Sequence, residues 1–512
     1  MQMNSQRVLT TIAGCFASAW FQLFARGRNY STTKVKFLRA EHRFHLFLRK
    51  LLLYCYGTEK SLIDSLPRVV KVFAITVLEA YLDRCYRRAT ALILKHAEKR
   101  QPQTPTGSGV SIYCGTLGPG GTERQILNSA ISLRENDINC EVFCTNLSTK
   151  ANRFFLNDLR VLDVTVSEIT RINWEKELLR DSPSCGLDSD TIELFRQLPR
   201  DFYQIADFIA AMSTSKPRIV HCWLDDINVK AGLAAVFLGV EKIIISTRSV
   251  SPKNFLLFQP YMKTIYQELL ACPNVSIVNN SLAGAEDYAD WLKLEDKRID
   301  VIYNGIDFGA FDRLLKEQLR THYRQQLGID EEDKVVGGVF RLSEEKRPLL
   351  WLQVALQMLK DHGNLKFVVV GDGPLRESMQ NEIDAQGHTE NILLLGHRNE
   401  AQEILSVFDL FFLSSRKEGL PNVLLEAQAM GVPVASFRAG GAPETYEINQ
   451  SGILLFEEDP ESVARELSRR LFDENWLDNA SKSGPVFVNE RFSIPLMYRA
   501  LSKIYERVGK LS

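Results

Sequence analysis

Residues 409–437 read DLFFLSSRKEGLPNVLLEAQAMGVPVASF, and this stretch decides the fold. The run DLFFLSS has the length and apolar character of a buried strand, and VPVASF has them again. Between them lie the loop RKEGLP and the helical pattern NVLLEAQAM, which Asn422 can cap at its start and Gly431 can end. A strand, a helix and a strand in this order predict one unit of a parallel α/β sheet.

Units of this kind fill two long parts of the chain. From residue 334 onward, six apolar runs alternate with helical patterns: KVVGGVFRL, LKFVVVG, NILLLG, DLFFLSS, VPVASF and GILLF. Between residues 109 and 280, the runs are SIYCGTL, CEVFCTN, RIVHCWL, KIIISTR and VSIVNN. The alternation predicts two Rossmann-like, doubly wound parallel-sheet domains. Such sheets bind ligands beyond the carboxyl ends of their strands, so two of them facing across a cleft would let two substrates meet.

Length and composition fit this architecture. The 512 residues are too many for one hydrophobic core. A hydrophobic share of 45% and a charged share of 24% exclude a disordered chain, a collagen-like fibre and a polytopic membrane protein. We expect a helical extension over 1–107, Rossmann-like domains over 108–310 and 311–490, and a terminal helix over 491–512 that packs back on the first domain.

Charge is divided unevenly along the chain. The net charge of −1 gives no basic field that would favour nucleic acid as a partner. Residues 1–100, however, hold 18 Lys and Arg against 6 Asp and Glu, a net charge of +12 that is balanced by −13 in the rest. The helical patterns at 41–56 and 66–98 are basic and amphipathic. They can lie on an anionic membrane surface or pack as a bundle on the acidic body.

Two features bear on localisation. The uncharged run 8–25 leaves three interpretations open: a membrane span, a signal peptide and an amphipathic helix. The nine cysteines are odd in number and scattered, and none forms a Cys-x-x-Cys motif, which favours reduced thiols. We therefore expect a cytoplasmic protein, either free or peripheral on the cytoplasmic face of the membrane.

Two glycine-rich turns follow predicted strands. The turn GPGGTE (118–123) could let a ligand approach the backbone and the start of the next helix, or it could be only a tight turn. It lacks the lysine of a Walker loop and the third glycine of a dinucleotide fingerprint. The turn GDGP (371–374) is weaker evidence and is more typical of a structural turn.

Four charged residues lie near predicted strand ends. Arg341 and Lys346 suit a diphosphate, the first as a bidentate fork and the second as a point charge, although solvated surface charges are the alternative. Glu418 and Glu426 suit sugar or ribose hydroxyls, because carboxylates accept their hydrogen bonds. A glycosidase also uses two acids, but acids from one strand–loop–helix unit flank a bond awkwardly. Glu426 could instead serve the helix dipole or an ion pair.

In combination, residues 108–505 resemble the family-4 retaining glycosyltransferases of the GT-B fold, in particular those of bacterial surface-polysaccharide assembly. The resemblance rests on GGTER (120–124), YNGID (303–307), GVFRLSEEK (338–346), VVVGDGP (368–374), LLLGHR (393–398), EGLPNVLLEAQAMGVPV (418–434) and GGAPE (440–444). It implies an acceptor domain over 108–310 and a nucleotide-sugar domain over 311–490. The basic extension lies outside it.

The resemblance also implies site residues. The donor would contact Gly120, Gly121, Arg341, Lys346, His397, Arg398, Glu418, Gly419, Leu420 and Glu426. Among these, Arg341 and Lys346 would hold the diphosphate, and Glu418 would contact the transferred sugar with help from the backbone of Gly419 and Leu420. Glu426 would bind the ribose, and residues 396–398 would border the base. The catalytic candidates are Glu418, Arg341, Lys346 and His221.

The first domain matches the family less closely. Members often carry His-x-His near the reacting centre, whereas this chain has His221 followed two residues later by Trp223. His221 is therefore only a candidate, and a core role on a buried strand is the alternative. Trp223 and Arg248 are acceptor candidates. The sequence DSD (188–190) resembles the metal-binding motif of another glycosyltransferase fold, but it lies in a polar loop and no His/Cys cluster has zinc spacing, so we expect no metal or other cofactor.

These features predict transfer of a hexose-type sugar from a nucleoside diphosphate, UDP in the first place, to a hydroxyl on a lipid-linked or polysaccharide glycan. The resemblance implies retention of the anomeric configuration. Three alternatives stay open: a sugar-nucleotide epimerase, a retaining sugar phosphorylase and a non-catalytic membrane-associated scaffold.

Overall fold

The computed structural model describes residues 68–106, 109–177, 186–255, 259, 261–295, 299–311 and 313–506. The predictions for 8–25 and 41–56 lie outside these residues. The chain divides into two compact units. Within the described residues, one unit holds 68–95, 174–177 and 188–203, and the other holds both predicted sheets.

The smaller unit is helical. It contains most of α3 (Arg68–Ala97) together with α6 (Trp174–Glu177), α7 (Ser189–Arg196) and the 3₁₀ turn η2 (Arg200–Phe202), so the helix predicted at 66–98 is confirmed. The Tyr86 hydroxyl donates to Asp201 at 3.0 Å, and its ring lies 6.0 Å from that of Phe202. In the DSD motif, Asp188 caps α7 by accepting from the Thr191 amide at 2.7 Å.

The first sheet has seven parallel strands in the order β3-β2-β1-β4-β5-β6-β7. They are β1 (Val110–Cys114), β2 (Cys140–Cys144), β3 (Thr165–Glu168), β4 (Ile219–Trp223), β5 (Lys242–Thr247), β6 (Val275–Asn279) and β7 (Ile299–Val301). The helices between them are α4 (Gly121–Glu135), α5 (Leu156–Val161), α8 (Tyr203–Ser215), α9 (Asp225–Phe237), α10 (Tyr261–Leu270) and α11 (Leu282–Leu292). The central strands β1, β4 and β5 are wholly buried, as their continuous apolar runs require.

The second sheet has six parallel strands in the order β10-β9-β8-β11-β12-β13. They are β8 (Lys334–Val339), β9 (Leu365–Val370), β10 (Ile392–Gly396), β11 (Leu410–Leu413), β12 (Val434–Phe437) and β13 (Gly452–Leu455). Its helices are α12 (Arg313–Leu327), α13 (Pro348–Asp361), α14 (Arg376–Gln386), α15 (Ala401–Ile404), α16 (Asn422–Ala429), α17 (Pro460–Leu471) and α18 (Glu474–Phe492). Six strands were predicted here and all six are present.

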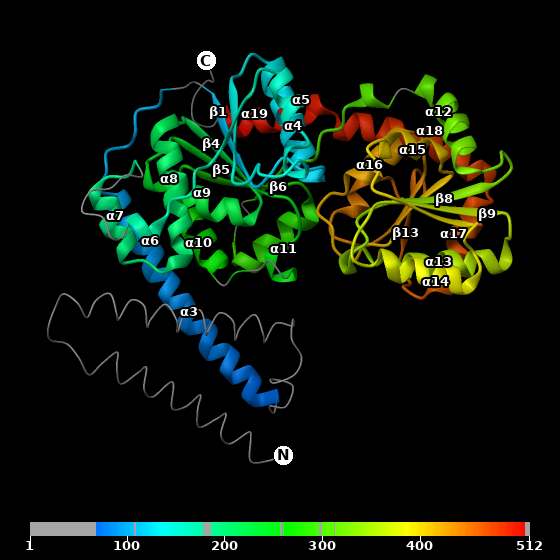
Figure 1. The fold of residues 1–512 in the computed structure, drawn as a ribbon, viewed down its shortest axis with the longest axis horizontal. Helices are drawn as coiled ribbons and strands as arrows, with labels where there is room; N and C mark the ends of the chain where they lie inside the picture. Colours follow the sequence, from blue (N-terminus) through cyan, green and yellow to red (C-terminus); the bar gives the residue numbers. More distant parts are fainter. Residues whose placement is uncertain are drawn as a thin grey trace. The chain divides into compact units, whose positions relative to one another are not determined.

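The last described helix, α19 (Ile494–Glu506), follows α18 but belongs to the core of the first sheet (Figure 1). It packs against α4, and its buried residues Met497, Leu501 and Ile504 join the same hydrophobic cluster as Ile126 and Leu133 of α4. Residues from the end of the chain therefore help to hold the first sheet together.

Strand order reverses once in each sheet, between β1 and β4 in the first and between β8 and β11 in the second. Ligands of doubly wound sheets bind at such switch points, beyond the carboxyl ends of the strands. The loops that follow these four strands carry most of the predicted site residues.

Candidate functional site

The switch point of the second sheet brings two predicted site residues together. Because β8 and β11 are hydrogen-bonded neighbours, the loops that follow them lie side by side. Lys346 ends the 3₁₀ turn η5 (Glu344–Lys346) after β8, and Glu418 lies in the loop between β11 and α16. Lys346 Nζ lies 2.5 Å from Glu418 Oε1, and only 9% of the Glu418 side chain is exposed. The nearly buried carboxylate is thus neutralised by the ammonium group.

Arg341 follows β8 and is exposed, with no hydrogen bond or ion pair from its guanidinium to any described residue. The GDGP turn holds its backbone, since the Phe340 and Leu342 amides donate to the carbonyls of Val370 and Asp372 at 3.0 Å each. Gly371 has φ +142°, and a Cβ there would overlap the Phe340 carbonyl. The GDGP turn therefore positions the Arg341 loop, which is the structural role predicted for it.

The start of α16 differs from the prediction at one residue. Pro421, not Asn422, occupies the N-cap position, and Asn422 is the first residue of the helix. The Asn422 side chain instead donates to the Gly121 carbonyl at 3.1 Å and accepts from Asn304 Nδ2 at 2.6 Å and from Gln125 Nε2 at 3.4 Å. It could not cap the helix because its amide crosses to the first domain. Gly431 follows the end of α16 with φ +70°, as predicted.

Two helix N-termini meet at this contact. Helix α4 begins at Gly121, and α16 begins at Asn422, whose Nδ2 lies 3.1 Å from the Gly121 oxygen. Neither N-cap residue caps its helix through its side chain, but at α4 the Glu123 carboxylate accepts from its own backbone amide, so that N–H group is already bonded. Both helices direct their positive ends to one place, which suits an anion. Gly120 precedes α4, and the Glu123 carboxylate lies where a Cβ of Gly120 would stand.

Glu426 lies on α16 and is 8% exposed. Burial raises the pKa of its carboxyl group, while the nearby Arg124 of α4 opposes this shift. Arg124 Nε lies 4.0 Å from Glu426 Oε1, and Gln402 Nε2 donates to the same oxygen at 3.3 Å. Glu426 is therefore less fully neutralised than Glu418 and faces a cation of the first domain.

Gly419 and Leu420 lie against the first domain. Leu420 O accepts from Asn304 Nδ2 at 2.9 Å, and Gly419 O accepts from the Gly441 amide at 2.8 Å. A Cβ at Gly419 would overlap the backbone carbonyl of Arg248, so no larger residue fits there without a shift of one loop. The loop after β11 thereby lies against the loop after β5.

Arg248 and Trp223 lie at the carboxyl ends of β5 and β4. The Arg248 guanidinium stacks on the Trp223 ring at 4.6 Å, and its Nη2 donates to Asn304 Oδ1 at 2.5 Å. Arg248 Nε and Trp223 Nε1 are buried without a hydrogen-bond partner among the described residues. Burial lowers the pKa of Arg248 to about 9. The first sheet thus presents a cation that no carboxylate of the described chain neutralises.

His221 has no contact with the Lys346–Glu418 pair. Its ring is completely buried in the middle of β4, and Nδ1 lies 2.8 Å from the hydroxyl of Tyr505 on α19. Burial lowers the pKa of His221 to about 3, so the ring is neutral at physiological pH. This placement agrees with the core role that was the alternative to catalysis, because the ring is fully buried and bonded to Tyr505.

His397 and Arg398 follow β10 and are both exposed. Strand β10 is an edge strand, separated from β8 by β9, and the structure shows no contact between these residues and the pair at the switch point. Arg398 Nη1 lies 3.8 Å from Glu400 Oε1. Their role beside a nucleotide base stays a prediction.

Sequence reasoning missed the polar contacts that join the domains. Glu444 of the second domain accepts from the Leu282 and Ala283 amides at 2.8 and 2.9 Å and from the Tyr303 hydroxyl at 3.0 Å. It therefore caps α11 of the first domain. Within the first domain, Gln125 bonds both the amide and the carbonyl of Gly305, and it also donates to Asn422 of the second domain at 3.4 Å. The GGAPE and YNGID motifs were the signals available, but neither indicates its partner.

Metal-ligand side chains do not cluster in the part of the chain that the structure describes, where no three His, Cys, Asp or Glu residues could hold an ion together. None of the helices within the described ranges combines the length and apolar character that a membrane crossing requires. Six cysteines fall within the described residues, and each is a thiol rather than half of a disulfide.

Comparisons with known proteins agree with this architecture. The chain matches the family described as glycosyl transferases group 1 over residues 320–485. It is 32% identical over 388 residues to the Vi polysaccharide biosynthesis protein VipC/TviE of Salmonella typhi, which covers 71% of this chain and 66% of that protein. Three other curated relatives are covered over 54% to 59% of their length.

Two further proteins are similar to this chain over more than half of its length. The chain is 30% identical over 297 residues to the UDP-Gal:alpha-D-GlcNAc-diphosphoundecaprenol alpha-1,3-galactosyltransferase of Escherichia coli, covering 56% of this chain and 74% of that protein. A crystal structure of Anabaena HepE in complex with UDP superimposes with a TM-score of 0.63 and 19% identity, covering 78% of this chain and 100% of that one. The chain therefore belongs to the glycosyl transferases group 1 family and has its two-domain GT-B fold.

Proposed function

We propose that this glycosyltransferase moves a hexose-type sugar from a nucleoside diphosphate, most directly UDP, to a glycan hydroxyl with retention of configuration. The observation that carries the proposal is the ion pair between Lys346, which follows β8, and Glu418, in the loop that leads into α16, near the N-termini of α4 and α16. Such a site offers positive charge to a diphosphate and a carboxylate to sugar hydroxyls.

Each part of the donor has a group in the site that binds it. The diphosphate lies at the N-termini of α4 and α16, with Lys346 and Arg341 as its cations. Glu418 accepts hydrogen bonds from the transferred sugar, Gly419 and Leu420 support it with their backbone, and Glu426 accepts from the ribose. HepE, a protein of the same fold, has been crystallised with UDP, which supports this nucleotide.

The reaction needs charge stabilisation more than acid–base chemistry. Negative charge grows on the leaving diphosphate as the sugar–oxygen bond breaks, and fixed cations and backbone dipoles stabilise it without reorganisation. The acceptor hydroxyl attacks the face from which the diphosphate leaves and passes its proton to the departing phosphate oxygen, so UDP is released and the configuration is retained. His221 takes no part, since its ring is buried and neutral. We propose that no metal ion is needed, and transfer that survives EDTA would agree with this.

The acceptor is proposed to be a lipid-linked or polysaccharide glycan. One relative's name places it in Vi polysaccharide biosynthesis, and another's names a diphosphoundecaprenol-linked acceptor. Trp223 and Arg248 are the acceptor candidates. The Trp223 ring is buried beneath the Arg248 guanidinium, so Arg248, which no described carboxylate neutralises, is the group that binds a phosphate or carboxylate of the acceptor, and Trp223 supports it.

We further propose that the basic N-terminal part holds the enzyme on an anionic membrane surface. On α3, Arg84, Arg88 and Lys95 are exposed on one face, while Tyr86 and Ile93 are buried on the other. Each cation near such a surface contributes about 1 kcal/mol. Flotation of the full chain with phosphatidylglycerol vesicles checks this, and the triple substitution Arg84→Glu, Arg88→Glu and Lys95→Glu should reduce it. Equal flotation of both proteins would contradict the proposal.

The test of the proposed reaction uses Glu418→Gln. A thermal-shift screen of nucleotide sugars first identifies the donor, which a non-catalytic scaffold would not bind. Glu418→Gln should then reduce transfer far more than UDP affinity, because Glu418 contacts the sugar and not the nucleotide. Equal losses of both would remove Glu418 from the sugar. Donor conversion without an acceptor would favour the epimerase, and a requirement for inorganic phosphate would favour the phosphorylase.

A further inference from the structure

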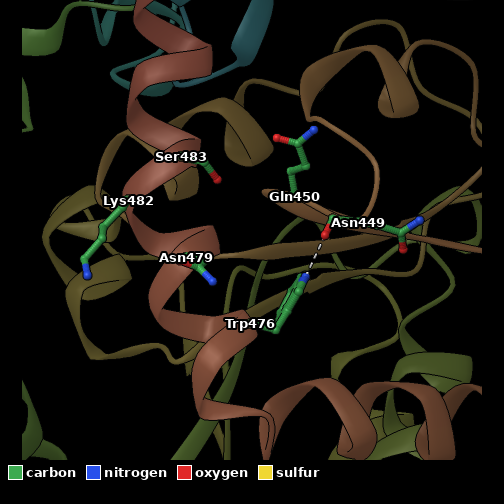
Figure 2. Close-up of a pocket in the computed structure, with 6 residues that line it drawn as sticks. All are labelled: Asn449, Gln450, Trp476, Asn479, Lys482 and Ser483. Carbon is green, nitrogen blue, oxygen red and sulfur yellow. Dashed lines mark hydrogen bonds between the residues drawn. The ribbon is translucent and has the colours of Figure 1, made fainter.

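A second pocket lies on the nucleotide-sugar domain, away from the switch point. It has a volume of about 520 Å³ and is lined by Asn449, Gln450, Trp476, Asn479, Lys482 and Ser483. One wall is the turn between η7 (Ala442–Thr445) and β13, and the other is α18 (Figure 2). Cavities of this size accommodate small ligands.

The lining of the pocket is rich in amides and nearly neutral. The side chains of Gln450 and Asn479 are exposed and have no hydrogen-bond partner among the described residues. Lys482 is neutralised by Asp478, with Nζ 2.5 Å from the carboxylate. Amide groups donate and accept hydrogen bonds side by side, which matches the paired hydroxyls of a sugar ring. An ionic ligand would find no unneutralised charge here.

The indole of Trp476 is held firmly at the pocket. Its Nε1 donates to the Asn449 carbonyl at 2.9 Å, the one bond drawn in Figure 2. Asn449 has φ +65°, a left-handed conformation that turns this carbonyl toward the indole. The Arg470 guanidinium lies 5.2 Å from the Trp476 ring centre and donates to Asn449 Oδ1 at 3.0 Å. The turn, the indole and the guanidinium form a rigid platform beside the free amides.

We propose that this pocket binds a neutral segment of a glycan chain, remote from the point of transfer. The proposal rests on the proposed function, because a polysaccharide acceptor is long enough to reach a second site on the same domain. Its chemistry is an amide-lined pocket whose one lysine is paired with Asp478, next to Trp476, which is only 8% exposed; its free amides suit hydroxyl-rich, uncharged rings. The ligand is therefore the distal part of the acceptor or product, and the pocket raises affinity for long chains over short ones.

Both walls of the pocket rest on the helix that carries Glu426. Gln428 of α16 donates to the Thr445 carbonyl at 2.6 Å and accepts from the Ser451 hydroxyl at 2.8 Å, which fixes the turn. Gly484 of α18 lies against Gln428, where a Cβ would be 3.3 Å from Gln428 Cβ. A glycan held in the pocket is thus attached to the same rigid elements that position the donor site.

The test compares two amide pairs of the full-length protein. Gln450→Ala with Asn479→Ala removes the free amides of the pocket, and Asn381→Ala with Gln386→Ala removes an exposed pair on α14 as a control. Saturation-transfer NMR with maltotetraose, cellotetraose and chitotetraose is run with excess UDP. We expect at least one tetrasaccharide to bind wild type, the control and Glu418→Gln alike, and to lose at least fivefold in affinity for the pocket variant.

Kinetics complete the test. The pocket variant should raise the KM for a long acceptor about fivefold and leave the KM for a short acceptor unchanged. The inference is wrong if no tetrasaccharide binds at millimolar concentration, if the pocket variant binds as well as wild type, or if Glu418→Gln alone removes binding. UDP binding, measured separately by thermal shift, distinguishes these outcomes from a failure of the proposed donor site.

Discussion

The switch points of the two sheets hold charge in opposite ways. At the second sheet, Lys346 and Glu418 neutralise each other at 2.5 Å. At the first sheet, Arg248 lies on Trp223 with a buried Nε that has no partner among the described residues. The first arrangement is complete without a ligand, whereas the second lacks an anion. Under the proposed function, a donor would compete with Glu418 for Lys346, while an acceptor or phosphate group would complete the surroundings of Arg248.

The two switch points should also differ in how their charges affect the stability of the folded protein. Removing one partner of a nearly buried ion pair leaves the other charge without compensation and destabilises the protein. Removing a buried charge that has no acidic partner relieves a cost instead. Substitutions at the two switch points should therefore move stability in opposite directions while both reduce activity, a pattern expected where function limits stability.

The largest effect is expected for Lys346→Ala. Loss of a charged contact to the leaving diphosphate should slow transfer about 100-fold, or about 3 kcal/mol. The melting temperature should fall as well, because Glu418 then lies nearly buried without its cation. Initial rates and thermal unfolding of the same preparation measure both effects.

Lys360→Ala is the matched control, since Lys360 is exposed on α13 and its side chain bonds only the half-buried Gln357 at 2.9 Å. It should keep the wild-type rate and melting temperature. A folded Lys346→Ala protein with a near wild-type rate would contradict both the diphosphate role and the comparison of the two switch points.

A smaller effect on activity is expected for Arg248→Met, and its effect on the melting temperature should be opposite to that of Lys346→Ala. Methionine keeps an apolar contact with Trp223 but removes the uncompensated cation. The KM for the acceptor should rise about tenfold, or about 1.4 kcal/mol, with the KM for the donor unchanged. The melting temperature should stay level or rise. A rise in the donor KM instead would assign Arg248 to the diphosphate, and a lower melting temperature would show that its bond to Asn304 outweighs the charge.

Much of the fold could be predicted because its strands are apolar runs. All eleven predicted strands are present, and the two that were missed, β3 and β7, are edge strands. The four residues of β3 are exposed or half-buried, and β7 has only three residues, so neither makes a continuous apolar run. A buried position leaves a hydrophobic signal in the sequence, and an edge position often does not.

Residues of the site could be predicted only where charged side chains come soon after a predicted strand. Lys346 and Glu418 were predicted to share a ligand, and they meet because β8 and β11 are neighbours in the sheet. The contacts of Asn422 with Gln125 and Gly121 join residues 297 and 301 positions apart, and no periodicity marks such a pair. His221 is the opposite case. Histidine is a common catalytic residue, but here it lies in the centre of β4, and its ring contacts Tyr505 of α19.

The smallest expected effect is a difference in thermal stability between two variants of the second domain, Glu426→Gln and Glu418→Gln. Burial raises the pKa of Glu426, so the folded protein favours its protonated form more than the unfolded chain does. That contribution to stability is fully present below the pKa of the unfolded state and is lost as the pH rises through the folded pKa. Glu426→Gln keeps the shape without the charge, so it should melt slightly above wild type at pH 7.5 and level with it at pH 4. Glu418→Gln should show no such gain, since its charge is already neutralised by Lys346. Thermal unfolding across this pH range measures the difference, and a Glu426→Gln protein less stable than wild type at pH 7.5 would mean that Arg124, 4.0 Å away, compensates the charge in full.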